Sequence, residues 1–401
     1  MTLLNNEQKV RLHKLYNEQR FAELELEIEM ISDFKTRSAF LSNLLGVAKL
    51  RRKDQKDWLG AKELFLDSYK KDPNYIDALC NYSHVSVKLR DYDDALKKLI
   101  ENKKNGYNPK INEALARIYF FEGEIDKELE LFKENEKNND LNIRTASHFL
   151  TSLNYSSKYT QESYLEYCKK IDEKFSVSKE NLKKLNNLKI GKDLRVGFVS
   201  PDLKEHSVYY FLKVTIDELR KNSIKVYLFN LRDPIELDDI TENVKKSCDG
   251  WVDLYNKNDI DAANLIRENQ INILIDIVGH FARNRFSIFK YKPSPIQVSW
   301  MGFVNTSGIK EIDYIIADPV LIKNEEEKFY SEKVLKLNNI WNCHKGFDED
   351  VEVSPPPFLK NGYLTFGCFN NSVKISQNCI NTWSQILKKI KNSKLLIKAS
   401  S

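Results

Sequence analysis

The sequence predicts two kinds of fold in one chain, an α superhelix followed by an α/β domain with a doubly wound parallel sheet. Two observations predict this. Up to about residue 155 the apolar residues recur with a helical period, and whole segments repeat about every 34 residues. From Leu194 onward, short apolar runs typical of buried strands alternate with helical patterns. That alternation is the pattern of parallel strands joined by crossover helices.

The repeats are visible in two registers. Ala61 in AKELFLDSYKKDPN recurs 34 residues later as Ala95 in ALKKLIENKKNGYNP, and Glu128 follows 33 residues after that. In the second register, Ala78 matches Ala114. Small residues at helix crossings with this period are typical of tetratricopeptide repeats, with 7–30 and 38–71 as more degenerate copies. Because both registers agree, we favour the repeats over the alternative, a plain α-helical bundle.

The α/β part begins with the run LRVGFVSPDLKEHS, a buried strand that ends at a turn. The expected strands are 194–199, 224–230, 271–277, 295–300 and 312–317, with helices at 207–220, 237–247 and 259–269. A second unit then begins, with a strand expected at 363–368, a helix at 376–391 and a strand at 393–398. We therefore expect a helical-repeat domain over 1–155, a helical linker over 156–193, a first catalytic lobe over 194–358, and the start of a second, nucleotide-binding lobe over 359–401.

Composition excludes several classes. The net charge is only +5, from 63 basic and 58 acidic residues, which gives no case for nucleic-acid binding. Six cysteines are scattered without a C-x-x-C pair, so reduced thiols and no metal site are expected. The N-terminus does not have the pattern of a signal peptide, and no apolar run approaches the roughly 20 residues of a membrane span. We expect a soluble, cytoplasmic protein.

Two histidines follow predicted strands. His206 lies between the first strand and a helix that Ser207 can cap, and proximity to a helix N-terminus favours a neutral, base-competent ring. His280 ends the segment IDIVGH after another strand. Ligands bind at the carboxyl ends of parallel strands, so both are candidate catalytic residues. The alternatives are an exposed loop histidine and a turn histidine bonded to backbone.

Two further segments are candidates for phosphate binding. The segment WMGFVNTSG has glycines and two hydroxyls, and its amides can hold a diphosphate. Lys374, in FNNSVKI, follows the first strand of the second lobe and suits a phosphate-bearing leaving group. An ordinary turn and a surface lysine are the alternatives.

Four segments together resemble the O-linked N-acetylglucosamine transferase family, in its bacterial SPINDLY-like branch. They are LRVGFVSPDLKEHSV, IDIVGHFARNRFSIFKYKPSPIQVSWMGFVNTSGIKEIDYIIADP, YSEKVLKL and GYLTFGCFNNSVKIS, in the family's order and behind the same repeats. The resemblance implies a GT-B fold with two Rossmann-like lobes. It also implies metal-independent, inverting transfer of a sugar from a nucleotide sugar, preferably UDP-GlcNAc, to Ser or Thr hydroxyls of proteins bound by the repeats.

The resemblance assigns roles by position. His206 matches the family's general base or acceptor-orienting histidine, and His280 matches the bacterial form of its motif. Thr306, Ser307 and Gly308 match the loop against donor phosphates and acceptor. Lys374 matches the lysine that neutralises the departing diphosphate, and Asn371 matches a nucleotide-contacting amide. No cofactor or metal is implied, only the nucleotide-sugar donor.

The chain departs from the family pattern in two ways. Val304-Asn305 stands where the family usually has Pro-Gly, and the sequence reaches Ser401 one strand, helix and strand into the second lobe. We therefore expect little catalysis by residues 1–401 alone. Two alternatives stay open: a protein O-fucosyltransferase that uses GDP-fucose, and a catalytically dead repeat scaffold.

Overall fold

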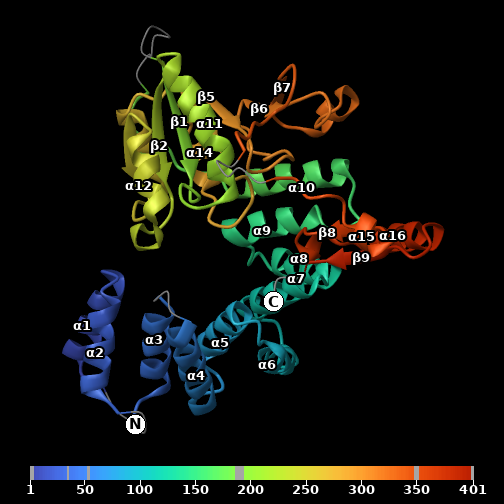
Figure 1. Ribbon diagram of the computed structural model, residues 1–401. Coiled ribbons are helices and arrows are strands. Elements are labelled where there is room, and N and C mark those ends of the chain that lie inside the picture. Colours follow the sequence, from blue (N-terminus) through green and yellow to red (C-terminus); the bar gives the residue numbers. More distant parts are fainter. Residues whose placement is uncertain (1–3, 34–35, 52–54, 186–193, 347–351, 399–401) are drawn as a thin grey trace. The chain divides into compact units, whose positions relative to one another are not determined.

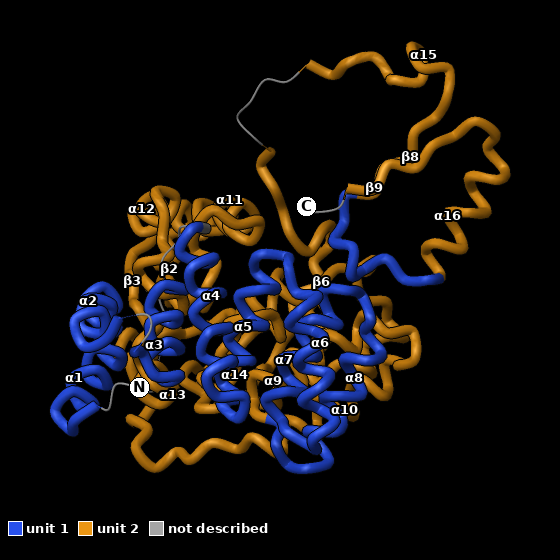
Figure 2. Tube along the Cα trace, turned by 90° about the horizontal axis from the view of Figure 1, so that it is seen from below, with its two compact units in different colours: residues 1–141, 369–377, 399–401 blue, residues 142–368, 378–398 orange. Residues whose placement is uncertain are grey.

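The computed structural model describes residues 4–33, 36–51, 55–185, 194–346 and 352–398. These residues form two compact units, shown in blue and orange in Figure 2. The first unit contains residues up to Leu141 together with Phe369–Gln377, and the second contains Asn142–Cys368 and Asn378–Lys398. Part of the predicted linker, residues 186–193, lies outside the described residues.

The first unit is a series of helix pairs, which confirms the predicted helical repeats (Figure 1). Its helices are α1 (Asn6–Asn17), α2 (Phe21–Ile31), α3 (Ala39–Leu50), α4 (Gln55–Lys71), α5 (Ile76–Lys88), α6 (Asp93–Lys103), α7 (Pro109–Glu122) and α8 (Ile125–Lys137). The residues that revealed the period lie where helices cross. Ala61, Ala78 and Ala95 are fully buried. At Gly46 a Cβ atom would come within 2.7 Å of the Phe65 ring, so this crossing needs a glycine.

The second unit is built on a seven-stranded parallel sheet of order β3-β2-β1-β4-β5-β6-β7. Its strands are β1 (Arg195–Ser200), β2 (Lys225–Asn230), β3 (Gly250–Asp253), β4 (Ile273–Asp276), β5 (Ile296–Ser299), β6 (Tyr314–Ala317) and β7 (Lys333–Lys336). Five of these confirm predicted strands. Strands β3 and β7 were not predicted from the sequence. Both are short and lie at the edges of the sheet, and their partial exposure weakens the apolar signal.

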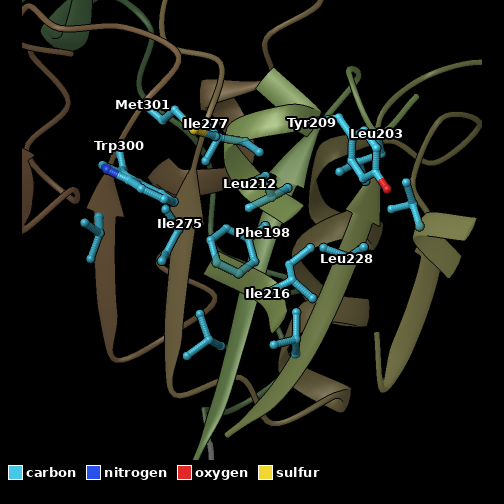
Figure 3. Packing of buried hydrophobic residues seen from close by; sticks show 14 residues of the cluster. Phe198, Leu203, Tyr209, Leu212, Ile216, Leu228, Ile275, Ile277, Trp300 and Met301 are labelled. Atoms are coloured by element: carbon cyan, nitrogen blue, oxygen red, sulfur yellow. The ribbon is translucent and has the colours of Figure 1, made fainter. Parts of the chain in front are cut away.

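Helices cover both faces of the sheet, as a parallel sheet requires. On one face, α11 (Ser207–Lys221) and α12 (Asp239–Lys246) pack against β1 and β2; Figure 3 shows Leu212 and Ile216 over Phe198 and Leu228. On the opposite face, α13 (Asp259–Glu268) and α14 (Phe286–Lys290) bury a second cluster around Phe229. This double winding outward from the neighbouring strands β1 and β4 confirms the predicted fold class.

Helices α9 (Ile143–Leu153) and α10 (Gln161–Lys174) belong to the sheet unit. The sequence analysis had placed α9 with the repeats and α10 in a linker. The structural reason for the difference is a set of buried polar contacts to the sheet. One of them is the ion pair of Asp172 on α10 with Lys290 on α14, whose side chains are only 7% and 4% exposed.

The start of the predicted second lobe has the expected elements. Strands β8 (Thr365–Cys368) and β9 (Lys394–Ile397) pair in parallel, and α16 (Gln377–Lys389) connects them. The short helix α15 (Phe358–Asn361) precedes β8. Of the described helices, none is long and apolar enough to cross a membrane.

Candidate functional site

The strand order creates a switch point between β1 and β4. From β1 the chain winds outward to β2 and β3, and it then returns to the other side of β1 to form β4 to β7. The segments that follow β1, β4 and β5 therefore meet at one edge of the sheet, and ligands of such sheets bind in the crevice there. His206, His280 and residues 306–308 all lie in these segments.

His206 is the accessible member of the group. It is the N-cap residue of α11, with extended backbone, and its Nδ1 accepts a hydrogen bond from the Val208 amide at 3.3 Å. The cap is therefore His206 itself and not Ser207, as the sequence had suggested. Its side chain is 43% exposed, and Nδ1 lies 3.9 Å from Asp202 Oδ2. Because Nδ1 accepts, the neutral ring carries its hydrogen on Nε2.

A chain of ion pairs runs beside His206. Arg232 bridges Asp202 and Glu236 with both distances at 2.9 Å, and Glu236 also contacts Arg283 at 2.6 Å. The carboxylate of Glu236 is half-buried, which tends to raise its pKa, but the two arginines hold the pKa below its usual value. Arg232 also donates to the Pro201 carbonyl, so the network fixes the turn that leads to His206.

His280 is buried, with 3% of its surface exposed. Its Nε2 lies 2.8 Å from the carbonyl oxygen of Ser307, and its Nδ1 lies 3.1 Å from the hydroxyl of Ser147 on α9. A carbonyl can only accept, so Nε2 carries the hydrogen and Nδ1 accepts from Ser147. Burial lowers the pKa of His280 to about 4. In this structure both ring nitrogens hold protein groups together, whereas the sequence analysis had predicted a catalytic residue.

The segment 306–308 is also enclosed. Thr306 and Ser307 are at most 1% exposed. At Gly308 φ is +69°, and a Cβ atom would come within 2.3 Å of the Cys168 side chain on α10. The hydroxyl of Tyr164, also on α10, donates to the Thr306 carbonyl at 3.3 Å. The loop is therefore packed against the helix that precedes the sheet.

Its amides already have acceptors. The Thr306 amide donates to Asn305 Oδ1 at 2.8 Å, the Gly308 amide to Thr306 Oγ1 at 3.2 Å, and the Ile309 amide to Ser307 Oγ at 3.2 Å. The Ser307 amide donates to a carboxylate. We had expected these amides to hold a diphosphate. The difference arises because side chains of the loop itself take the hydrogen bonds that a phosphate would need.

The carboxylate on the Ser307 amide belongs to Glu332, which the sequence analysis did not single out. Glu332 is 3% exposed and comes 25 residues after Ser307. The signal that could have revealed it is its place in YSEKVLKL, one of the segments that carried the family resemblance. An acidic residue in front of an edge strand is otherwise indistinguishable from a surface residue.

Asp276 is the last residue of β4 and is also buried. It accepts hydrogen bonds from the amides of Gly279 at 2.8 Å and Val278 at 3.3 Å, which shape the turn before His280. Burial raises the pKa of Asp276 to about 7, in spite of these two hydrogen bonds. The turn therefore contains two buried titratable groups, Asp276 and His280, and burial shifts the pKa of each so that its neutral form is favoured.

Asn371 and Lys374 belong to the first compact unit. Asn371 caps a single turn of 3-10 helix, Ser372–Lys374, and its Oδ1 accepts from the Val373 amide at 3.2 Å. The Lys374 side chain is exposed. Across the described ranges, no group of three or more His, Cys, Asp and Glu residues is arranged to hold a metal ion.

Comparison with known proteins identifies the sheet unit. The family model for glycosyl transferase family 41 matches residues 161–344, from α10 to just beyond β7. Among curated proteins, a tomato (Solanum lycopersicum) protein named probable UDP-N-acetylglucosamine--peptide N-acetylglucosaminyltransferase SPINDLY is 29% identical over 252 residues, which cover 62% of this chain and 27% of the relative. The barley (Hordeum vulgare) protein of the same name is 33% identical over 207 residues, 51% of this chain and 22% of its own. The chain thus spans about a quarter of the length of these relatives.

A solved structure has the same fold. A mutant of the Thermobaculum terrenum O-GlcNAc transferase superposes with a TM-score of 0.77 at 21% identity, covering 90% of this chain and 69% of its own. The family match begins at Gln161, the first residue of α10, in agreement with the packing of α10 on the sheet. Residues 161–344 therefore match glycosyl transferase family 41, and helical repeats precede the matched region.

Proposed function

We propose that this chain acts in protein O-glycosylation, moving N-acetylglucosamine from UDP-N-acetylglucosamine to Ser or Thr hydroxyls of protein acceptors. The observation that carries the proposal is the family 41 match, which covers β1 to β7 and the edge where His206 lies. The names of the curated relatives support the donor and the peptide acceptor.

The proposed reaction is a single inverting displacement. The acceptor hydroxyl oxygen forms a bond to the anomeric carbon, the bond from that carbon to the diphosphate breaks, and the hydroxyl proton passes to a phosphate oxygen of the departing diphosphate. His206 is the group proposed to meet the hydroxyl, because its ring is accessible at the switch point. While Nδ1 accepts from Val208, the neutral ring presents Nε2–H. This favours a hydrogen bond that orients the acceptor oxygen over direct removal of its proton.

The leaving group carries negative charge, and a positively charged side chain stabilises it. We assign this role to Lys374 and a nucleotide contact to Asn371, so the proposal requires no metal ion. We do not assign the phosphates to the amides of residues 306–309, because those amides already donate to protein oxygens. In this proposal the site is supported by buried residues that do not contact the substrate, namely Thr306, Ser307, Gly308 and His280.

The helical repeats are proposed to bind the acceptor protein, because stacked helix pairs form an extended surface suited to peptides. Their helices α1 to α8 are complete pairs in the first unit.

The test is calorimetric titration of the 401-residue chain with UDP, UDP-GlcNAc and GDP-fucose. We expect UDP and UDP-GlcNAc to bind and Lys374→Ala to abolish binding. Lys388→Ala, on the exposed end of α16, is the matched control and should bind normally. Stronger binding of GDP-fucose than of UDP-GlcNAc would identify a fucosyl nucleotide as the donor. Binding of no nucleotide would overturn the proposal in favour of a non-catalytic scaffold.

A further inference from the structure

The carboxylate of Glu332 is a buried acceptor that gathers the donors of one loop. Oε2 accepts from the Thr306 hydroxyl at 2.6 Å and from the Ser331 hydroxyl at 3.2 Å. Oε1 accepts from the Ser307 amide at 2.8 Å and from the Ser307 hydroxyl. Within the described ranges no Lys, Arg or His forms an ion pair with Glu332. Its charge is therefore balanced by hydrogen-bond donors, most of them from residues 306 and 307.

This arrangement fixes the direction of each donor in the loop. The Thr306 hydroxyl gives its hydrogen to Glu332, and its oxygen accepts from the amides of Gly308 at 3.2 Å and Ser331 at 3.1 Å. The Ser307 hydroxyl gives its hydrogen to Glu332 and accepts from the Ile309 amide. Because every polar group of Thr306 and Ser307 is satisfied, the loop has little reason to rearrange.

The same hydrogen bonds continue to the helices before the sheet. The Ser307 carbonyl holds His280, and His280 holds Ser147 on α9. The Thr151 hydroxyl, one turn later on α9, donates to the His280 carbonyl at 2.9 Å. On the other side of the loop, the Tyr330 hydroxyl donates to the carbonyl of Val304, whose side chain is 45% exposed at the sheet edge. Glu332 is therefore enclosed beneath the loop 304–308. It can affect the carboxyl ends of the strands only through the residues of this loop.

We propose that Glu332 is a positioning residue of the transferase. Its carboxylate holds the loop 304–308, which follows β5, in one conformation before any substrate binds, and we call this contact the clamp. This role rests on the proposed function. Glu332 itself does not touch the substrate, because it is enclosed by Thr306, Ser307 and Ser331.

The first test measures amide hydrogen exchange in the intact chain without any nucleotide, in Glu332→Ala, Glu332→Gln and the wild type. We expect the amides of 306–309 to exchange at least about tenfold faster in Glu332→Ala, because a hydrogen bond to a charged group is lost. Glu332→Gln keeps one carbonyl acceptor and should lie between the two. The control is Glu325→Gln on the exposed turn Asn324–Phe329, with wild-type exchange. Unchanged exchange at 306–309 in Glu332→Ala would overturn the clamp.

The second test measures UDP-GlcNAc-dependent transfer to a peptide acceptor by the same variants. We expect kcat to fall about tenfold or more in Glu332→Ala with a smaller change in KM, and to recover largely in Glu332→Gln. Equal losses in Glu332→Gln and Glu332→Ala, or a loss only in KM, would contradict a positioning role. Absence of transfer in the wild type would overturn the proposed function and its positioning residue together, while the exchange data would still decide the clamp.

Discussion

Two histidine segments at the same edge of the sheet have opposite environments. His206 caps a helix after β1, its side chain is 43% exposed, and its Nδ1 accepts from the Val208 amide. His280 follows β4, is 3% exposed, and has both nitrogens bonded to protein. A place at the carboxyl end of a strand therefore does not decide whether a histidine is accessible to a ligand or holds protein groups together. Only the partners of its two nitrogens distinguish the two roles.

The buried contacts extend from His280 to α10. Loss of the ion pair between Asp172 on α10 and Lys290 should cause the largest loss of stability. In Asp172→Ala, Lys290 remains buried without its carboxylate, and we expect the free energy of unfolding to fall by about 3 to 5 kcal/mol. Asp217→Ala removes an exposed partner of Lys213 and should cost less than about 1 kcal/mol. Urea unfolding of both variants measures the difference, and equal costs would mean that α10 is not anchored by this pair.

His280→Ala should give the next largest effect. It leaves the Ser307 carbonyl without its donor and opens a cavity beside Phe286 and Phe303, whose rings contact the imidazole. We expect the free energy of unfolding to fall by about 2 to 4 kcal/mol. A variant that keeps wild-type stability but loses nucleotide-dependent transfer would instead make His280 a member of the reacting group.

The two shifted pKa values predict opposite pH dependences. Asp276 has a pKa of about 7 in the fold against 3.8 when unfolded, so the unfolded chain holds fewer protons in that window and stability falls as pH rises through it. His280 has a pKa of about 4 against 6.5, so the unfolded chain holds more protons and stability rises with pH there. Between about pH 4 and 6.5 the two contributions oppose each other.

Removing one group should therefore expose the other. Relative to the wild type, the free energy of unfolding of Asp276→Asn should gain a positive slope over this window, and that of His280→Gln a negative slope. Each should approach about 1.4 kcal/mol per pH unit. Urea unfolding at several pH values measures both slopes. Parallel curves for the two variants would show that neither group titrates differently in the fold.

His206→Ala should have the smallest effect on stability and a large one on the reaction. Loss of the cap contact costs at most about 1 kcal/mol, because the hydrogen bond is long and exposed. Under the proposed function, transfer should fall by about two to four orders of magnitude. Thermal unfolding and a transfer assay on one preparation measure both quantities. A strong loss of stability in His206→Ala would show that His206, like His280, holds the fold together.

Much of the fold could be predicted because its signals are local. The repeat period, the five central strands and helices α11 to α13 each follow from apolar spacing within one segment. Strands β3 and β7 could not be found in the same way, since edge strands bury only part of their length. The place of α9 and α10 depends on partners more than a hundred residues away, such as Lys290 for Asp172.

The candidate site was predicted as a set of positions, and the roles of those positions depended on contacts that the sequence does not reveal. Thr306 and Ser307 have the composition of an anion-binding loop. Glu332, later in the chain, takes their donors, and Cys168 and Tyr164, earlier in the chain, cover the loop. His206 was recognised because its signal is local, a polar turn between a strand and a helix.

The most direct measurement is amide hydrogen exchange of the wild-type chain with and without UDP-GlcNAc, followed in peptides covering 200–210 and 300–310. We predict that the amides of 306–309 are protected as strongly as those of β1 before nucleotide is added. Of these two peptides, we predict that only the one around His206 gains protection when nucleotide binds. Fast exchange at 306–309 that slows on addition of UDP-GlcNAc would contradict an enclosed loop, because those amides would then be free to bind the donor phosphates.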